Sequence, residues 1–582
     1  MGKKLLSIFL VAIMLLSLAA CDNTKEETTT VATTTKAGET TTATTEPDLP
    51  YDYGMDVTFH ADEPTTYSMY FSDASWYALT DTWKTEGIFA KITELTNVTL
   101  DITAISSNDY TEAITLEIGS GQAKYIIPKV YDESDYVAGG AVVPVSDYVQ
   151  YMPYYQDFVT KYNMQPDLAT ITKADGKYYR LPGMLEAPMQ DYTLLIRNDI
   201  FKAAGVDVAA LESDWTWNDL CDELIKVKAY MVENGMCKAS DYIWSDLWSG
   251  SESGQGNGGN LLKLMGASYG VPSGWAVGNG MQYDADTDSW YFASVTDDYK
   301  EFITVASRFV NEGILSPETF TQDDSTATSK FFTGETVIMS VNRGKYADFE
   351  KGITEILGTG NFELYVAVSP IGSNTYIAER NRLENGVMIS QNALDDLGEE
   401  GFIEMMRFVD WLWYSPEAYV LTKWGVEGET FEYVTNAAGD QVKQLLPGFK
   451  CGGLGISNPD PAINDTLTDI RVQWGYAGGV FYYGGTLEEM RDNFIPVILD
   501  FNARIDEYRT VKAIDPAVAA DEDQNEALTL IKTELIQNVN TWTLLFVTGQ
   551  KDITADWDEY VASCENLDYQ TMVDMTNEIY KG

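Results

Sequence analysis

A tryptophan beside two glycines and a carboxylate is the clearest candidate for ligand contact in the sequence. The run from Trp424 to Gly428 reads WGVEG, so Glu427 follows the ring by three residues. An indole offers a flat apolar face, a carboxylate accepts hydrogen bonds, and glycine permits unusual backbone angles beside them. Such groups favour reversible binding of a molecule that has apolar faces and polar edges. The alternative is that Trp424 only anchors a helix to a loop in the core.

Other aromatic residues are candidates for the same kind of contact. The chain contains 14 Trp and 36 Tyr. Part of this set must be core, because tryptophan is mostly buried on average. The complete set of predicted ligand-binding residues is Trp76, Tyr131, Asp132, Trp248, Trp275, Trp424, Glu427 and Trp474.

Catalytic and metal-binding motifs are weak by comparison. The single histidine, His60, argues against a His base or a multi-His zinc site. Asp284, Asp286 and Asp288 alternate as calcium ligands do, but the later Gly and Glu of an EF-hand loop are missing. We expect an ordinary hairpin turn there. No catalytic residue, metal site or cofactor is predicted.

Length and charge restrict the class of protein. The 582 residues exceed one hydrophobic core and indicate two or more domains. A net charge of −51 excludes nucleic acid as a probable partner, because phosphate binding requires clustered Lys and Arg. The same charge disfavours anionic polymers as ligands, although a local basic cleft stays open as an alternative.

The first residues have the pattern of a bacterial lipoprotein signal. Lys3 and Lys4 precede an apolar run, and the sequence LAAC ends at Cys21. This pattern predicts a signal peptide over residues 1–20, acylation of Cys21, and anchoring to the outer face of the cytoplasmic membrane.

A threonine-rich segment follows the signal. Residues 21–50 contain three TTT runs, and Val31 and Leu49 are their only large apolar side chains, so we expect the lipidated cysteine and a disordered tether. Four cysteines remain in the body, without CxxC spacing. We expect buried free thiols, and Cys221 with Cys237 is the only sequence-close pair that could form a disulfide.

The first part of the body alternates between predicted strands and helices. Strands are predicted over 65–71, 98–105 and 125–131, with helices over 88–96 and 109–119 between them. This order indicates a parallel sheet covered by helices. Ligands bind beyond the carboxyl ends of such strands, which is where Trp76, Tyr131 and Asp132 lie.

The segment from Phe402 to Tyr433 begins as a helix, because apolar residues recur at spacings of three and four. Ser415 and Pro416 predict a break and the start of a second helix. This stretch resembles the family 1 extracellular solute-binding proteins of sugar ABC importers, in particular a large Gram-positive lipoprotein branch with alginate-binding relatives. The matching residues are Phe408, Asp410, Trp411, Tyr414, Ser415, Glu417, Trp424, Gly425, Glu427 and Gly428, while Ala418 replaces the family's glycine.

Weaker matches over residues 176–183, 192–205, 215–220, 311–320 and 557–561 follow the family's order. The resemblance implies a two-lobed α/β fold of the type II periplasmic-binding-protein class, with discontinuous lobes joined by a hinge. The expected lobes are 51–180 plus 386–428 and 181–385 plus 429–582. Residues 231–241 lack the calcium ligands found in some relatives, so no metal is carried over.

The resemblance also implies a function. The protein would be a monomeric surface lipoprotein that captures an oligosaccharide between its lobes and delivers it to ABC permease subunits. Aromatic platforms fit the C–H faces of pyranose rings, and carboxylates bond the hydroxyls. A peptide-binding ABC lipoprotein is the main alternative. A secreted glycoside hydrolase is less favoured because the order of the motifs matches binding proteins, while the paired acids of the chain do not discriminate. An adhesin is less favoured because no repeats occur.

Overall fold

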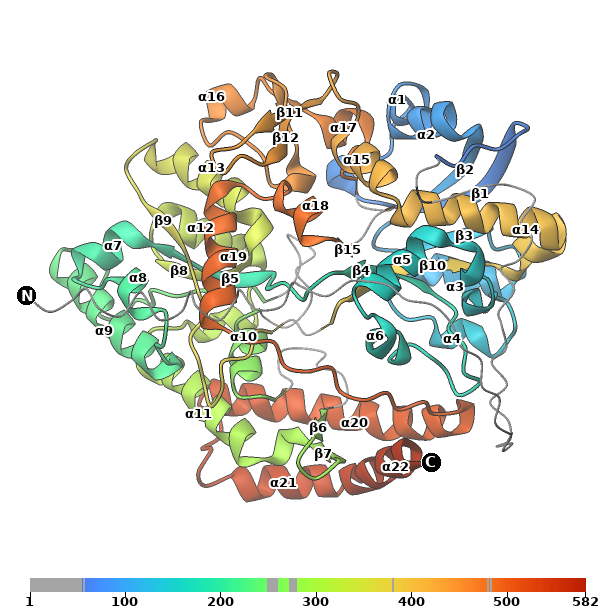
Figure 1. The fold of residues 1–582 in the computed structure, drawn as a ribbon. Coiled ribbons are helices and arrows are strands. Elements are labelled where there is room, and N and C mark those ends of the chain that lie inside the picture. Colours follow the sequence, from blue (N-terminus) through green and yellow to red (C-terminus); the bar gives the residue numbers. More distant parts are fainter. Residues whose placement is uncertain are drawn as a thin grey trace, which may run out of the picture. The chain divides into compact units, whose positions relative to one another are not determined.

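A mixed sheet of six strands forms the first of two lobes. The computed structural model describes residues 55, 58–248, 260–271, 280–378, 381–478, 481 and 484–582 (Figure 1). The strand order in this sheet is β15-β4-β10-β3-β1-β2. The strands are β1 (Thr65–Asp73), β2 (Val98–Ser106), β3 (Ile126–Val130), β4 (Leu181–Leu185), β10 (Leu383–Ile389) and β15 (Gly484–Gly485).

The first three strands confirm the predicted parallel arrangement. β1 runs parallel to both β2 and β3, whereas β10 is antiparallel to β3 and β4. Burial alternates at the start of β2, where Val98 and Leu100 face the core and Thr99 faces solvent. Helices α2 (Ile88–Thr96) and α3 (Tyr110–Gly119) lie between these strands in the chain and pack against β2.

Two helices of the tryptophan-rich stretch that begins at Phe402 also belong to this lobe. They are α14 (Gln391–Tyr414) and α15 (Pro416–Trp424). The Ser415 hydroxyl accepts a hydrogen bond from the Ala418 N–H at 3.0 Å, which confirms the predicted helix start. Asp410 of α14 accepts the N–H groups of Tyr154 and Tyr155 at 3.0 and 2.8 Å. These bonds join α14 to the first turn of α5 (Pro153–Lys161).

The second lobe contains a smaller sheet with the order β8-β5-β9, in which both pairings are antiparallel. Its strands are β5 (Tyr192–Arg197), β8 (Ile338–Asn342) and β9 (Leu364–Ala367). Helix α9 (Trp217–Glu233) begins with a capping box in which Thr216 and Asp219 bond each other's backbone N–H. The core of this lobe also includes α10 (Asn260–Ser268), α11 (Asp297–Asn311), α19 (Pro496–Tyr508) and α20 (Glu522–Val547).

The chain passes between the two sheets in three places. It leaves β4 towards β5, returns from β9 into β10, and leaves again after β15 through α18 (Leu487–Arg491) towards α19. The three passages are linked at the sheet, where the Leu185 N–H donates to the Arg382 carbonyl at 2.8 Å and the Glu186 N–H donates to the Gly485 carbonyl at 3.0 Å. Since β4, β10 and β15 are neighbours, all three passages lie at the same end of the same strands.

The segment after α15 packs differently from the predicted lobe boundary. Residues 429–582 are predicted to belong to the second lobe, but Phe431, Cys451 and Phe481 belong to the hydrophobic core of the first lobe. Strand β4 likewise lies in the first sheet, although the predicted boundary precedes it. Local patterns do not reveal this arrangement, because the contacts join residues far apart in the sequence.

Shorter elements fill the remaining described segments. The strands are β6 (Met281–Asp284), β7 (Ser289–Phe292), β11 (Phe431–Thr435), β12 (Gln441–Leu445), β13 (Phe449–Lys450) and β14 (Thr468–Asp469). The helices are α1 (Asp81–Thr85), α4 (Ser134–Val137), α6 (Gln165–Ala169), α7 (Asn198–Ala203), α8 (Val208–Leu211), α12 (Asp324–Thr333), α13 (Tyr346–Leu357), α16 (Pro461–Asn464), α17 (Ile470–Trp474), α21 (Trp557–Glu565) and α22 (Tyr569–Lys581). Among the described residues, no helix has the length and apolar character required to cross a bilayer.

Candidate ligand-binding pocket

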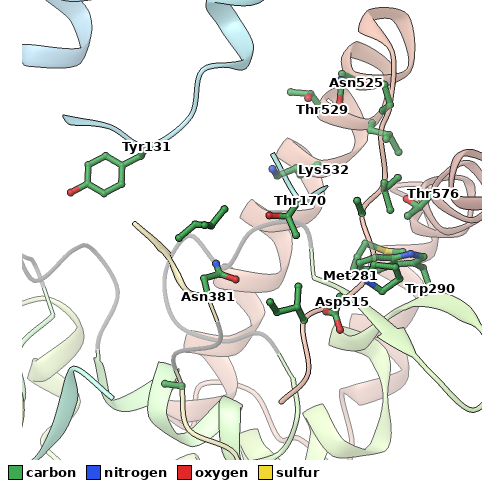
Figure 2. A pocket seen from close by; sticks show the side chains of 18 of the residues that line it. Tyr131, Thr170, Met281, Trp290, Asn381, Asp515, Asn525, Thr529, Lys532 and Thr576 are labelled. Carbon is green, nitrogen blue, oxygen red and sulfur yellow. Dashed lines mark hydrogen bonds between the residues drawn. The ribbon is translucent and has the colours of Figure 1, made fainter. Parts of the chain in front are cut away.

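A large pocket is lined by residues from both lobes. Its volume is about 870 Å³, near the upper end of the range typical of small-molecule sites. The first lobe contributes Tyr131, which directly follows β3, and Leu383 and Glu384 at the start of β10. Figure 2 shows Tyr131 extending from its loop, well separated from the labelled side chains of α20. The space is therefore bounded by the end of the sheet at which the parallel strands terminate.

The second lobe supplies an aromatic ring with a cation over it. Tyr192 begins β5, and the Lys263 ammonium lies 4.7 Å from the centroid of its ring. Asp191, the preceding residue, pairs with Arg343 at 3.1 Å. Asp191 lies in the short passage that follows β4 and Tyr192 lies at the start of the small sheet, so both lie where the two lobes are connected.

A hairpin, two helices and the segment 514–520 form the remaining wall. Trp290 of β7 lines the pocket, and its backbone is fixed by Asn577 of α22 through two hydrogen bonds of 2.8 Å. Its buried indole N–H has no hydrogen-bond acceptor among the described residues. Helix α20 presents polar side chains to the same space, namely Asn525, Thr529 and Lys532 (Figure 2).

Glu384 is a carboxyl group of the pocket whose pKa is raised above its ordinary value. Burial raises the pKa of Glu384 and the charge of Asp191 raises it further, while Lys129 and Lys263 act in the opposite direction. Its carboxylate has no hydrogen-bond or ion-pair partner within the described part of the chain. A ligand hydroxyl that reached this group would therefore gain an acceptor that the protein does not otherwise use.

Two of the predicted site residues are exposed aromatic rings of the first lobe. Tyr131 is 66% exposed and lines the pocket, whereas Trp76 is 58% exposed and lies outside its lining. The Trp76 ring contacts Tyr77 edge-on, with a centroid distance of 5.6 Å. Asp132 is exposed and accepts hydrogen bonds from the N–H and hydroxyl of Ser134, so it organises the start of α4.

The tryptophan of the WGVEG run is a core residue. Trp424 is completely buried and packs near Phe431, with a centroid distance of 6.1 Å. The indole is not accessible to a ligand in this arrangement, which fits the alternative of a core anchor. Glu427 is exposed and lines a separate groove of about 430 Å³ with Val420 and Tyr433. The large pocket includes neither residue.

The other predicted tryptophans do not join Tyr131. Trp248 is partly buried against Phe320, with ring centroids 4.9 Å apart, and Trp474 packs against Phe449 at 5.6 Å. Trp275 lies outside the described residues. Tyr192, Trp290, Glu384 and the polar face of α20 were not predicted as site residues. Only Trp290 carried a sequence signal, as an aromatic residue in a predicted hairpin.

The candidate calcium segment forms a hairpin turn, as predicted. The Asp286 N–H donates to Asp284 at 2.9 Å, and Thr287 donates to the same carboxylate at 2.8 Å, between β6 and β7. Within the described residues, no three His, Cys, Asp or Glu side chains gather in a way that could hold a metal ion. The four cysteines of the body are free thiols.

The family model for bacterial extracellular solute-binding proteins matches residues 87–380, just over half of the chain. The chain therefore belongs to this family, and its two-lobed α/β fold is the fold of these substrate-binding proteins. No match was found among curated protein sequences.

Solved structures of similar fold include three that align with most of the chain. The alginate-binding protein AlgQ2 without calcium ion has a TM-score of 0.62 and 16% identity, covering 90% of this chain and 100% of that one. The S. pneumoniae substrate-binding protein FusA in complex with kestose has a TM-score of 0.59 and 17% identity, covering 89% of this chain and 99% of that one. An extracellular solute-binding protein from Bifidobacterium longum subsp. infantis has a TM-score of 0.63 and 14% identity, covering 90% of this chain and 99% of that one.

Proposed function

We propose that the protein captures an oligosaccharide in the pocket between its lobes and delivers it to an ABC importer. The observation that carries this proposal is the pocket itself, which is large and combines aromatic rings with hydrogen-bonding groups from both lobes. Tyr131, Tyr192 and Trp290 supply apolar faces, while Glu384 and Asp191 supply acceptors. The alginate-binding protein and the complex with kestose, which have similar folds, support a saccharide over a peptide as the ligand.

The mechanism that we propose is closure of the two lobes around the ligand. A ligand that contacts both sheets binds the closed arrangement better than the open one, and this difference in affinity shifts the equilibrium towards closure. The closed form would then be the one that the permease recognises. The lobes in this proposal are the parts built on the six-stranded and three-stranded sheets, with residues 431–481 assigned to the first because of their shared core.

Calorimetric titration of a chain that lacks residues 1–52 tests the ligand class. This truncation is suitable because Tyr53–Gly582 form one compact unit. We expect micromolar binding to one class of oligosaccharide in a panel that also contains monosaccharides and tripeptides, and a smaller radius of gyration by X-ray scattering in that complex. Binding to peptides alone would contradict the saccharide proposal. Release of reducing ends from a bound oligosaccharide would instead support a hydrolase.

The location at the membrane surface is part of the same proposal. We propose that Cys21 carries the lipid that keeps the monomeric receptor near its permease, since the LAAC pattern matches the lipoprotein signal. The Cys21→Ser variant should lose incorporation of radiolabelled palmitate in a bacterial host and move from the membrane fraction to the medium or remain unprocessed. Equal palmitate incorporation in the variant and the parent would exclude this residue as the site of lipidation.

A further inference from the structure

Three cations of the first lobe are close enough for their charges to influence one another, and one of them lies beside Tyr131 of the large pocket. One is Arg471 of α17, whose guanidinium carbon lies 4.5 Å from the centroid of the Tyr77 ring. Its Nε is buried and has no hydrogen-bond partner among the described residues. The nearby carboxylate of Asp469 is occupied by backbone N–H groups, including that of Gly452 at 3.2 Å. The guanidinium therefore has donors available at a partly buried position.

The second cation is Lys423, in the last turn of α15. It lies beside the segment after α17, because the Ala477 N–H donates to the Thr422 carbonyl at 2.7 Å. Burial lowers the pKa of Lys423 to about 8, and the charges of Lys129 and Arg471 lower it further. The opposing influence comes from Cys451, a thiol whose own pKa is raised to about 12 by burial. No carboxylate in the described part of the chain pairs with this ammonium.

The third cation connects this cluster to the large pocket. Lys129 occupies the left-handed backbone region with φ of 63°, and its ammonium lies 5.7 Å from the ring centroid of Tyr131. Its charge acts on Lys423 and also on Glu384, which lines the pocket. We call Lys129, Lys423 and Arg471 the cation cluster.

Partly buried charges are ordinarily paired, because removing them from water is costly. In a chain with a net charge of −51, carboxylates are abundant, yet none pairs with Lys423 or with the guanidinium of Arg471 within the described residues. The negative charge of the rest of the chain repels an approaching anion only weakly. Salt screens charges that are farther apart than about 8 Å at physiological ionic strength. Contact with the cluster is screened far less.

From this cluster we infer that the captured oligosaccharide is acidic, and that a carboxylate or sulfate group of one sugar unit binds at Lys423 and Arg471 while neighbouring units extend towards Tyr131. This inference rests on the proposed function and narrows its substrate class. It also replaces the expectation from net charge that anionic ligands are disfavoured. A planar carboxylate suits Arg471 well, because a guanidinium can donate two parallel hydrogen bonds to it.

The test compares matched acidic and neutral ligands by calorimetry. Trigalacturonate, its fully methyl-esterified form and a sulfated galactose disaccharide are titrated into the chain that lacks residues 1–52. We expect at least one of the two acidic ligands to bind about tenfold or more tightly than the methyl ester. The acidic ligand of higher affinity shows whether the cluster prefers a carboxylate or a sulfate. In Lys423→Met and Arg471→Gln this preference should fall by about tenfold or more.

The control is Lys226→Gln on α9, which alters an exposed lysine paired with Glu223 at 2.7 Å and should leave the preference unchanged. Thermal unfolding of both variants without ligand separates loss of binding from loss of folding, and we expect Lys423→Met to melt no lower than the parent, since it removes a partly buried charge that no carboxylate pairs with. Micromolar binding of neutral oligosaccharides, without preference for acids, would overturn the inference and leave the proposed function standing. Absence of binding to every saccharide by the folded chain would overturn both.

Discussion

Replacing Tyr131 with alanine should weaken oligosaccharide binding by about tenfold or more without unfolding the protein. The ring directly follows β3, lines the large pocket and is 66% exposed, so it is available as a platform for a sugar face. Aromatic side chains at the centre of a binding surface often contribute about 2 kcal/mol or more. Removing an exposed ring changes the free energy of unfolding by only about 0.5 kcal/mol. Calorimetry gives the affinity, and thermal unfolding gives the stability.

Tyr131→Phe is the matched control, because it keeps the ring and removes only the hydroxyl. We expect this variant to bind within about threefold of the parent, as the apolar face provides most of the contact. If Tyr131→Ala binds the identified ligand as tightly as the parent does, the pocket at the end of β3 is not where the sugar stacks.

Replacing Arg382 with methionine should destabilise the protein strongly. Its guanidinium donates to the carboxylate of Asp167, which is 2% exposed, and to the Tyr162 carbonyl at 2.9 Å. Removing one partner of a buried pair leaves the other charge without compensation, which costs about 3–5 kcal/mol. Urea unfolding followed by tryptophan fluorescence should therefore show a much lower midpoint.

An exposed ion pair serves as the comparison for Arg382. Lys202 lies 2.7 Å from Glu363, and both side chains are about half exposed. Lys202→Met should change the unfolding free energy by no more than about 1 kcal/mol, as surface pairs usually do. Similar midpoints for Arg382→Met and Lys202→Met would mean that the Arg382 network contributes little to stability.

Local sequence patterns predict the elements of the first lobe well. The helix over Ile88–Thr96 has the predicted bounds, and the alternation after Val98 places that strand beside β1. Ser415 caps the second helix as expected. These features depend on periodicity and capping, which are properties of short stretches of chain.

The pocket depends on contacts that short patterns do not contain. Tyr131 was identified because the end of a parallel strand is a local feature, but Trp290 and the polar face of α20 reach the same space only through the packing of the second lobe. The burial of Trp424 could not be predicted for a related reason. An indole that binds a sugar and an indole that anchors a helix have the same local sequence, and only its complete burial distinguishes them.

The row of chain passages at the edge of the larger sheet limits how one lobe would move against the other. The Leu487 N–H donates to the Glu186 carboxylate at 2.8 Å, which adds to the backbone bonds between residues 185 and 382 and between 186 and 485. Two bodies joined by one strand of chain can twist freely, whereas three attachments side by side resist twisting. The remaining motion is hinge bending about the line through the three attachments. The mouth of the pocket would therefore open and close by rotation about a single axis.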